Sequence, residues 1–224
     1  MFDIITFDCY GTLVDWESGI SSAIMGAARR HGMRLEPEAV MAAYHRVEPE
    51  AEAGEFRPYR EVLARSASAT ARRLGWALEI SEAGFLAESL PDWPVFEDTN
   101  GALEQLKDAG HRLGILSNVD PDLLERTLEH FTVSFDLLVT AADVESYKPA
   151  LPHFARAKTL IGNKRWLHAA QSYFHDIVPA SGLGIPVVWV NRKGERPAGA
   201  VRPDGEVGNL RGLVEWLDRR PPAS

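Results

Sequence analysis

Apolar residues recur along the chain with two different spacings, and the change between them divides the sequence into regions. Residues 2–7 are mostly apolar and lead directly into Asp8, which is typical of a buried strand in a parallel sheet. Residues 15–94 instead carry apolar side chains three and four positions apart, which predicts a block of amphipathic helices. From Val95 onward, short apolar runs alternate with stretches of helical spacing.

The second half of the chain predicts further strands at 111–116, 135–140, 166–170 and 186–190. Helices are expected between and after them, at 101–109, 121–129, 152–161, 177–182 and 210–219. A stretch rich in Gly, Pro and charge, 193–208, is expected to be a solvated loop. Strands that alternate with helices through short connections form parallel sheets covered on both faces. The expected fold class is therefore α/β, a Rossmann-like parallel sheet with helices on both faces.

The helical block interrupts this α/β pattern, because one strand precedes it and the other strands follow it. We expect two domains, an α/β core from residues 1–14 and 95–224 and an inserted helical cap from residues 15–94. Sites enclosed between two domains favour small ligands and exclude bulk water.

Composition narrows the classes of function. The chain has 24 Lys and Arg against 32 Asp and Glu, a net charge of −8, so neither nucleic acid nor an anionic membrane is an expected partner. A small anionic substrate stays compatible, because a few arranged cations set the local field. The single cysteine, the core strand at the start and the lack of an apolar run near ~18 residues predict a cytoplasmic protein without a membrane span. A homodimer is expected only because symmetric dimers are common.

Asp8 is the strongest candidate for chemistry. It ends the first strand and precedes a tight turn containing Gly11 and Thr12, at the edge where open α/β sheets place their sites. A carboxylate there serves either as a nucleophile or as a simple helix cap, and the residue alone does not decide between them. The neighbouring Cys9 points to the other side of the strand and is expected to be buried core.

Polar residues also follow the other predicted strands. Ser117 and Asn118 end one of them, Lys148 precedes a helix after the next, and Asp176 follows a third. Because the carboxyl ends of parallel strands share one edge of a sheet, we expect these residues to meet Asp8 in one site.

These segments together resemble the motifs of the haloacid dehalogenase superfamily. Residues 7–13 are similar to its first motif, Ser117-Asn118 to its second, Lys148-Pro149 to its third, and the segment ending at Asp176 to its fourth. The resemblance covers nearly the whole chain, including the inserted helical cap, and it implies the haloacid dehalogenase fold.

Two positions separate the branches of this superfamily. Its phosphatases carry a second Asp where this chain has Tyr10, and a magnesium-binding carboxylate where it has Ser172. Magnesium prefers several hard oxygen ligands and an alkoxide leaving group needs a proton, whereas halide needs neither. Tyr10 resembles the type II, (S)-2-haloacid dehalogenase branch. The resemblance therefore implies hydrolytic dehalogenation of a short (S)-2-haloacid, with no metal and no cofactor.

In the implied mechanism, Asp8 attacks C2 of the substrate opposite the halogen, and water then hydrolyses the resulting ester. Lys148 would keep Asp8 ionised, while Asp176 would position Lys148 and help to activate the water. Ser117 and the backbone N–H groups after Asp8 would bind the substrate carboxylate or the oxyanion. The remaining expected substrate-binding residues are Tyr10, Thr12, Asn118 and, from the cap, Arg46.

Several positions depart from this branch. Arg46 matches the usual halide-binding Arg only loosely, and His45 is the neighbouring alternative. Characterised dehalogenases tend to have Ser and Asn where this chain has Gln171 and Tyr173, and Tyr where it has Phe154. Such changes can alter the substrate without altering the attack.

Two other functions stay open. One is a magnesium-dependent phosphatase acting on a small phosphorylated metabolite, and the other is a protein that binds a small anion or a partner without turnover. His168 and His175 flank the fourth motif, but no third ligand follows at the spacing of a zinc site, so a metal site is not expected.

Overall fold

The computed structural model describes residues 2–219, which form two compact units. One unit contains residues 2–14, 95–117 and 130–219, and we refer to it as the α/β unit. The other contains Asp15–Pro94 together with Asn118–Glu129, and we refer to it as the helical unit. We expected residues 118–129 to belong to the core; they group with the helical unit, and Asp120 among them bonds to Tyr59 of that unit.

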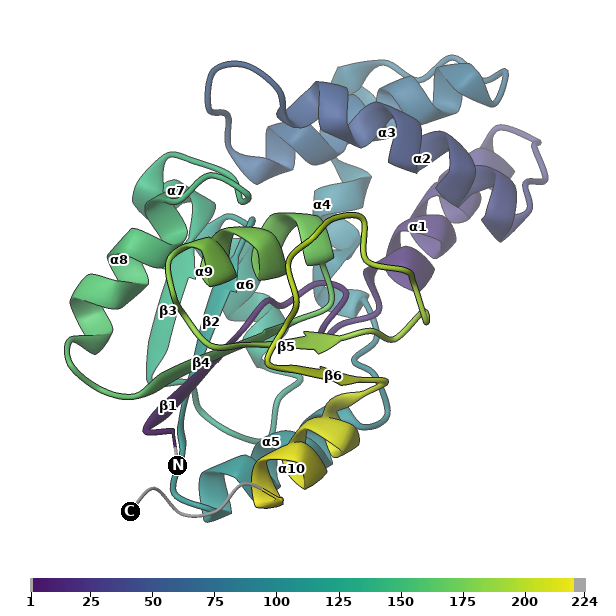
Figure 1. Cartoon of the computed structure of the whole chain (residues 1–224). Coiled ribbons are helices and arrows are strands. Elements are labelled where there is room, and N and C mark those ends of the chain that lie inside the picture. Colours follow the sequence, from purple (N-terminus) through teal and green to yellow (C-terminus); the bar gives the residue numbers. More distant parts are fainter. Residues whose placement is uncertain (1, 220–224) are drawn as a thin grey trace. The chain divides into compact units, whose positions relative to one another are not determined.

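The α/β unit is built on six parallel strands in the order β3-β2-β1-β4-β5-β6 (Figure 1). The strands are β1 (Ile4–Phe7), β2 (Arg112–Ser117), β3 (Leu137–Thr140), β4 (Trp166–Ala170), β5 (Val187–Val190) and β6 (Gly205–Val207). Every residue of β1, β4 and β5 is buried, which explains why these strands appear in the sequence as continuous apolar runs.

The strand order places a switch point between β1 and β4. From β1 the chain adds β2 and β3 on one side, whereas β4, β5 and β6 extend the sheet on the other. Phe7 of β1 pairs with Ile115 of β2 and with Ala169 of β4, so the loops after all three strands leave the same edge. In open α/β sheets, ligands bind at the carboxyl ends of the strands beside such a switch point.

Helices cover both faces of the sheet, so the expected α/β class is confirmed. Helices α5 (Thr99–Asp108) and α10 (Leu210–Asp218) pack side by side on one face, while α8 (Pro152–Ile161) and α9 (Val178–Gly182) lie on the other (Figure 1). Two short elements were not predicted from the sequence, α7 (Ala141–Val144) and the π-helical turn η3 (Tyr173–Ile177). Beneath α8 and α9 one apolar cluster includes Phe154, Trp166 and Trp189.

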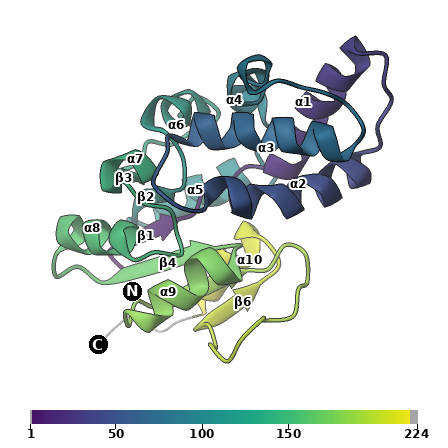
Figure 2. The same ribbon diagram turned by 90° about the horizontal axis from the view of Figure 1, so that it is seen from above.

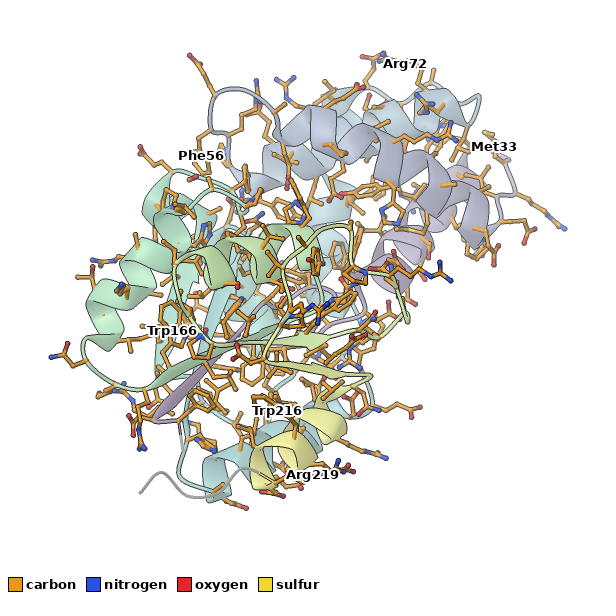
Figure 3. The ribbon with its side chains drawn as sticks, viewed as in Figure 1. Met33, Phe56, Arg72, Trp166, Trp216 and Arg219 are labelled. Carbon is orange, nitrogen blue, oxygen red and sulfur yellow. The ribbon has the colours of Figure 1, made fainter. Side chains whose placement is uncertain are left out.

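Strand β6 corrects the expectation that residues 193–208 form only a solvated loop. It pairs in parallel with β5 and is three residues long, too short to show an alternating pattern. Its first residue is Gly205, where a Cβ atom would come within 2.3 Å of the Trp216 indole, which rises from α10 (Figure 3). Gly205 therefore leaves room for the Trp216 indole and does not mark a turn.

The helical unit contains three long helices, α1 (Trp16–Arg30), α2 (Pro37–Glu52) and α3 (Tyr59–Arg73), of which α2 and α3 pack side by side (Figure 2). Shorter elements complete it, namely η1 (Ile80–Glu82), α4 (Phe85–Ser89), η2 (Leu90–Asp92) and α6 (Pro121–Leu128). Pro49 lies inside α2 and does not end it. Within residues 2–219, no helix is long and apolar enough to cross a membrane.

Asp120 connects α6 to α3 within the helical unit. Its carboxylate accepts the backbone N–H groups of Tyr59 at 2.7 Å and Arg60 at 3.0 Å, the first two residues of α3. Pro58, the residue that precedes α3, supplies no side-chain cap. The cap of α3 thus comes from a residue that is distant in the sequence, and Asp120 is buried in providing it.

Replacement of Asp120 by Ala should lower the free energy of unfolding by about 1–2 kcal/mol, because two N–H groups of α3 lose their acceptor. Urea denaturation of the whole chain measures this difference. Asp122→Ala is the matched control, since the Asp122 carboxylate pairs with Arg60 in an exposed position, and it should change stability by less than about 0.5 kcal/mol. Equal losses in the two variants would contradict the capping role of Asp120.

Candidate active site

Asp8 follows β1 directly and is only 8% exposed. Its Oδ1 atom accepts a hydrogen bond from Lys148 Nζ at 2.9 Å, and its Oδ2 atom accepts one from the Thr12 hydroxyl at 2.9 Å. Thr6 and Asp8 are two positions apart, so both project to the same side of the sheet, and Cys9 projects to the other. The carboxylate is therefore held at both oxygens.

Lys148 is the cation of the site and is almost completely buried, with 1% exposure. Its ammonium donates three hydrogen bonds, to Asp8 Oδ1 at 2.9 Å, to Asp176 Oδ1 at 2.6 Å and to the Leu116 carbonyl at 2.9 Å. The three acceptors come from three separate parts of the chain, namely the residue after β1, strand β2 and the π-helical turn η3. Asp8, Lys148 and Asp176, predicted from the sequence to meet, are brought together in the α/β unit.

The charges of this triad shift the pKa values in different directions. Burial raises the pKa of Asp8 above 3.8, and the Asp176 charge adds to this effect, while Lys148 and Thr12 oppose it. Burial also disfavours the Asp176 carboxylate, but the Lys148 charge and a hydrogen bond from His168 outweigh it and lower the pKa of Asp176 to about 2. Burial alone would lower the pKa of Lys148; the two carboxylates reverse the effect and raise it. The ammonium is therefore charged at neutral pH.

The turn after Asp8 is held by hydrogen bonds from within and from outside. The N–H groups of residues 11–14 all donate within the turn, to the carbonyls of Val14 and Cys9. The expectation that these N–H groups bind substrate is therefore wrong for residues 11–14. The Thr12 hydroxyl donates to Asp8 and accepts the Gln171 N–H at 2.9 Å, so both of its roles are used in orienting the carboxylate.

Arg192, which the sequence analysis missed, clamps the same turn. Its guanidinium donates to the Thr12 carbonyl at 2.8 and 3.1 Å and to the Asp98 carboxylate at 2.9 and 3.1 Å, and it stacks 3.9 Å from the Phe96 ring centroid. Asp98 also accepts the N–H of Leu210 at 2.6 Å. A lone Arg in a polar stretch carries no sequence signal for this role, because its partners are 94 and 180 positions away.

The other predicted polar residues of the sheet edge lie close in the chain to this triad. The Ser117 side chain is 1% exposed, and its hydroxyl has no hydrogen-bond partner within the part of the chain that the structure describes. It follows Leu116, whose carbonyl binds Lys148. Asn118, which follows Ser117 in the chain, is half-buried, and so is Tyr10, two residues after Asp8. Cys9 is fully buried, and burial together with the Asp8 charge raises the pKa of its thiol, so it is not a nucleophile.

Arg46 and its neighbours belong to the helical unit. Arg46 is exposed on α2. His45 Nε2 lies 2.9 Å from Glu17 Oε1, and the His45 ring stands edge-on to Trp16. Tyr44 is fully buried, as expected for an aromatic residue of a core. The assignment of Arg46 to a halide thus stays a proposal that rests on the sequence resemblance.

The positions that depart from the resembling motifs have definite roles in the fold. Tyr173 is 7% exposed, stacks edge-on against Trp189 and donates its hydroxyl to the Val201 carbonyl at 2.7 Å. Gln171 contributes its backbone, which donates to Thr12 and accepts from the Trp189 indole. Phe154 is fully buried and contacts His168 edge-on. The hydroxyl of Tyr173 is thus committed to the fold.

A family model of haloacid dehalogenase-like hydrolases matches residues 2–165. The chain belongs to this family, and the protein is a hydrolase. A curated relative named (S)-2-haloacid dehalogenase, from Pseudomonas sp. (strain YL), is 26% identical over 222 residues, which cover 96% of this chain and 94% of that protein.

Two solved structures share the fold. The L-2-haloacid dehalogenase of Xanthobacter autotrophicus with chloropropionic acid covalently bound superposes with a TM-score of 0.83 at 21% identity, over 99% of this chain and 100% of that one. The HAD-hydrolase YfnB of Bacillus subtilis, bound to magnesium, also has a TM-score of 0.83, at 16% identity, over 97% and 99% of the two chains. The fold alone therefore does not decide between a halide and a phosphate ester as substrate.

The donor set at Asp8 does not fit magnesium. Both carboxylates of the triad already bind the Lys148 ammonium. Tyr10 stands where a second carboxylate would be, and the Ser172 hydroxyl is committed to the N–H and Nδ1 of His175. Within residues 2–219, no three His, Cys, Asp or Glu side chains are grouped in a way that could hold a metal ion. Magnesium needs several hard oxygen ligands in octahedral geometry, and this arrangement supplies too few.

Replacement of Asp8 by Asn should stabilise the fold at pH 7. Because the pKa of Asp8 is higher in the folded chain than in the unfolded chain, the ionised carboxylate destabilises the fold at pH 7. Below 3.8 the residue is protonated in both folded and unfolded chains, and this effect disappears. The gain in the thermal midpoint should therefore shrink as the pH falls toward 4, with roughly 2–4 °C corresponding to 1 kcal/mol in a chain of this size.

Asp136→Asn is the control of opposite sign. Burial works against the Asp136 carboxylate, but hydrogen bonds from Lys107 and from the Leu113 N–H prevail and lower its pKa. Its neutralisation should therefore reduce the midpoint at pH 7. A loss of stability in Asp8→Asn at pH 7 would contradict the electrostatic account of the triad.

Proposed function

We propose that the protein hydrolyses the carbon–halogen bond of a short (S)-2-haloacid through an ester on Asp8, without a metal ion. The main support is one feature of the site, the single buried ammonium of Lys148 that binds both Asp8 and Asp176. A fixed protein cation then performs the charge neutralisation that a divalent ion would otherwise perform. The similarity to the Pseudomonas (S)-2-haloacid dehalogenase over 96% of the chain points to the same class of substrate.

The proposed first step is the attack of an Asp8 oxygen on C2 of the substrate. A bond forms between this oxygen and C2 while the carbon–halogen bond breaks, so that C2 is inverted and halide leaves with the electron pair. Halide needs no proton, which agrees with Tyr10 at the position of the phosphatase acid. Lys148 and Thr12 hold the carboxylate in one orientation before the attack.

In the proposed second step, water adds to the Asp8 carbonyl carbon, and the ester breaks between this carbon and the oxygen attached to C2. The product is the 2-hydroxy acid, and the Asp8 carboxylate is restored. Asp176 supports this step in our proposal, because its Oδ2 atom is buried and has no partner within residues 2–219. That oxygen is an acceptor to which the attacking water can donate.

Substrate binding is assigned to the polar groups beside the triad. The buried Ser117 hydroxyl, which has no partner within residues 2–219, is the donor proposed for the substrate carboxylate or the oxyanion. Tyr10 and Asn118 are proposed as further substrate-binding residues. Thr12 acts through Asp8, since its hydroxyl is fully used. Arg46 is proposed to bind the halide from the helical unit. Because Gln171, Tyr173 and Phe154 differ from the resembling dehalogenases, the acid side chain that the site prefers is left to experiment.

Halide release from (S)-2-chloropropionate should be seen with the purified protein and should be unaffected by EDTA. A generic phosphate ester, p-nitrophenyl phosphate, should not be hydrolysed with or without magnesium. Chloride and phosphate release, measured in parallel with wild type and Asp8→Asn, separate the two chemistries, and the variant should lose all turnover. Phosphate release that depends on magnesium, without chloride release, would replace this proposal by the phosphatase function.

The ester on Asp8 can be detected in a single turnover. With enzyme in excess over (S)-2-chloropropionate in ¹⁸O-water, the label should enter the Asp8 carboxylate, because water adds to the ester carbonyl. Mass spectrometry of the peptide containing Asp8 measures the incorporation, and the hydroxy acid should form unlabelled. Label found in the product and absent from the peptide would mean that water attacks the substrate directly.

A further inference from the structure

His168 contacts Asp176 and is completely buried in β4. Its Nε2 atom is 3.0 Å from Asp176 Oδ1, and its Nδ1 atom is 2.8 Å from the Thr6 hydroxyl. The same hydroxyl accepts the indole N–H of Trp166 at 2.7 Å. These contacts form a continuous chain from Trp166 through Thr6 and His168 to Asp176.

The strand register explains why these side chains meet. Thr6 and His168 are direct partners in the parallel pairing of β1 with β4. Trp166 precedes His168 by two residues, so its side chain lies on the same face of the sheet. Figure 3 labels Trp166 near the start of β4. Asp8 follows Thr6 by two residues and shares this face, which is why the chain of contacts ends at the triad.

Hydrogen-bond roles along the chain decide which ring nitrogen of His168 donates to Asp176. The Trp166 indole N–H is only a donor, so Thr6 Oγ1 accepts from it and keeps its own O–H and a second lone pair for His168 Nδ1. Asp176 Oδ1 is only an acceptor, so His168 Nε2 carries a proton and donates it to this oxygen. The opposite tautomer would set two lone pairs against each other at 3.0 Å, since Asp176 is ionised at neutral pH.

The groups that contact the His168 ring agree with a hydrogen bond from its Nε2–H to Asp176. Phe154 of α8 contacts it edge-on, at 5.4 Å between ring centroids, and offers no hydrogen-bonding group. The charged groups that it faces belong to the triad, Asp176 directly and Lys148 through the same Oδ1 atom. His153, the other fully buried histidine of this face, donates to the Ser117 carbonyl instead.

We propose that His168 is a positioning residue of the active site, held by Thr6 and Trp166 so that its Nε2–H donates to Asp176. Asp176 Oδ1 then receives both Lys148 and His168, which fixes the carboxylate plane and leaves Oδ2 for the attacking water. This relay, the chain of hydrogen bonds from Trp166 through Thr6 and His168 to Asp176, is inferred from the contacts alone. The expected effect of His168 on turnover rests on the proposed function.

The Nε2 proton is tested without any substrate. In ¹⁵N-histidine-labelled protein, two-bond ¹H–¹⁵N spectra should show a proton on His168 Nε2 at pH 7, assigned by its loss in His168→Gln. In Thr6→Val, this proton should remain on Nε2, because ionised Asp176 still needs a donor there. An unprotonated Nε2 in the wild type would overturn the proposal.

The effect on Asp176 is tested with a pair of replacements. His168→Leu removes the donor, whereas His168→Gln places an amide N–H where Nε2 was. The ¹³C titration of the Asp176 carboxyl, assigned with Asp176→Asn, should give a higher pKa in His168→Leu than in His168→Gln. His111→Leu is the control, because His111 is also buried but bonds to the Phe2 carbonyl, and it should leave this pKa unchanged.

Turnover supplies the last readout. His168→Leu removes one hydrogen bond to a charged group, so kcat for chloride release from (S)-2-chloropropionate should fall about tenfold or more, with little change in KM. His168→Gln should recover most of this loss. Equal kcat in the two folded variants would contradict a positioning role. If the wild type released no chloride, the proposed function would fail, while the two NMR experiments would still test the donation from His168 to Asp176.

Discussion

The site depends on one buried ammonium shared by two carboxylates. Lys148 offers its three N–H groups to Asp8, Asp176 and the Leu116 carbonyl, and none of these groups is well exposed to water. Loss of the ammonium would leave two buried carboxylates without compensation, and removing one partner of a buried ion pair typically costs about 3–5 kcal/mol. In the proposed reaction, the same contacts hold the Asp8 carboxylate in one orientation for attack.

Rigid support around the triad explains how a loop can hold the proposed nucleophile, Asp8, in place. In the turn after Asp8, the N–H groups of residues 11–14 donate within the turn, and Arg192 bridges the Thr12 carbonyl and Asp98. On the other side, His168 donates to Asp176 from the centre of the sheet. Groups held in this way need no rearrangement during reaction, which is the condition for effective electrostatic catalysis.

Much of the fold could be predicted from periodicity, because buried parallel strands appear as apolar runs and the helical block has a different spacing. Strand β4 was predicted with its observed ends, 166–170. Strand β6 was missed, since three residues that pair at a sheet edge carry no pattern. Residues 118–129 group with the helical unit, where Asp120 caps α3 across 61 positions, a contact that no local window of sequence contains.

The sequence by itself determined the family and predicted that Asp8, Lys148 and Asp176 meet, because each ends or follows a strand and parallel strands bring such ends together. Only the tertiary structure decided which group binds which. The clamp by Arg192 and the relay through His168 depend on distances between side chains from separate strands and loops. A histidine in an apolar strand looks like core filling until the register sets it opposite Thr6 and in reach of a carboxylate.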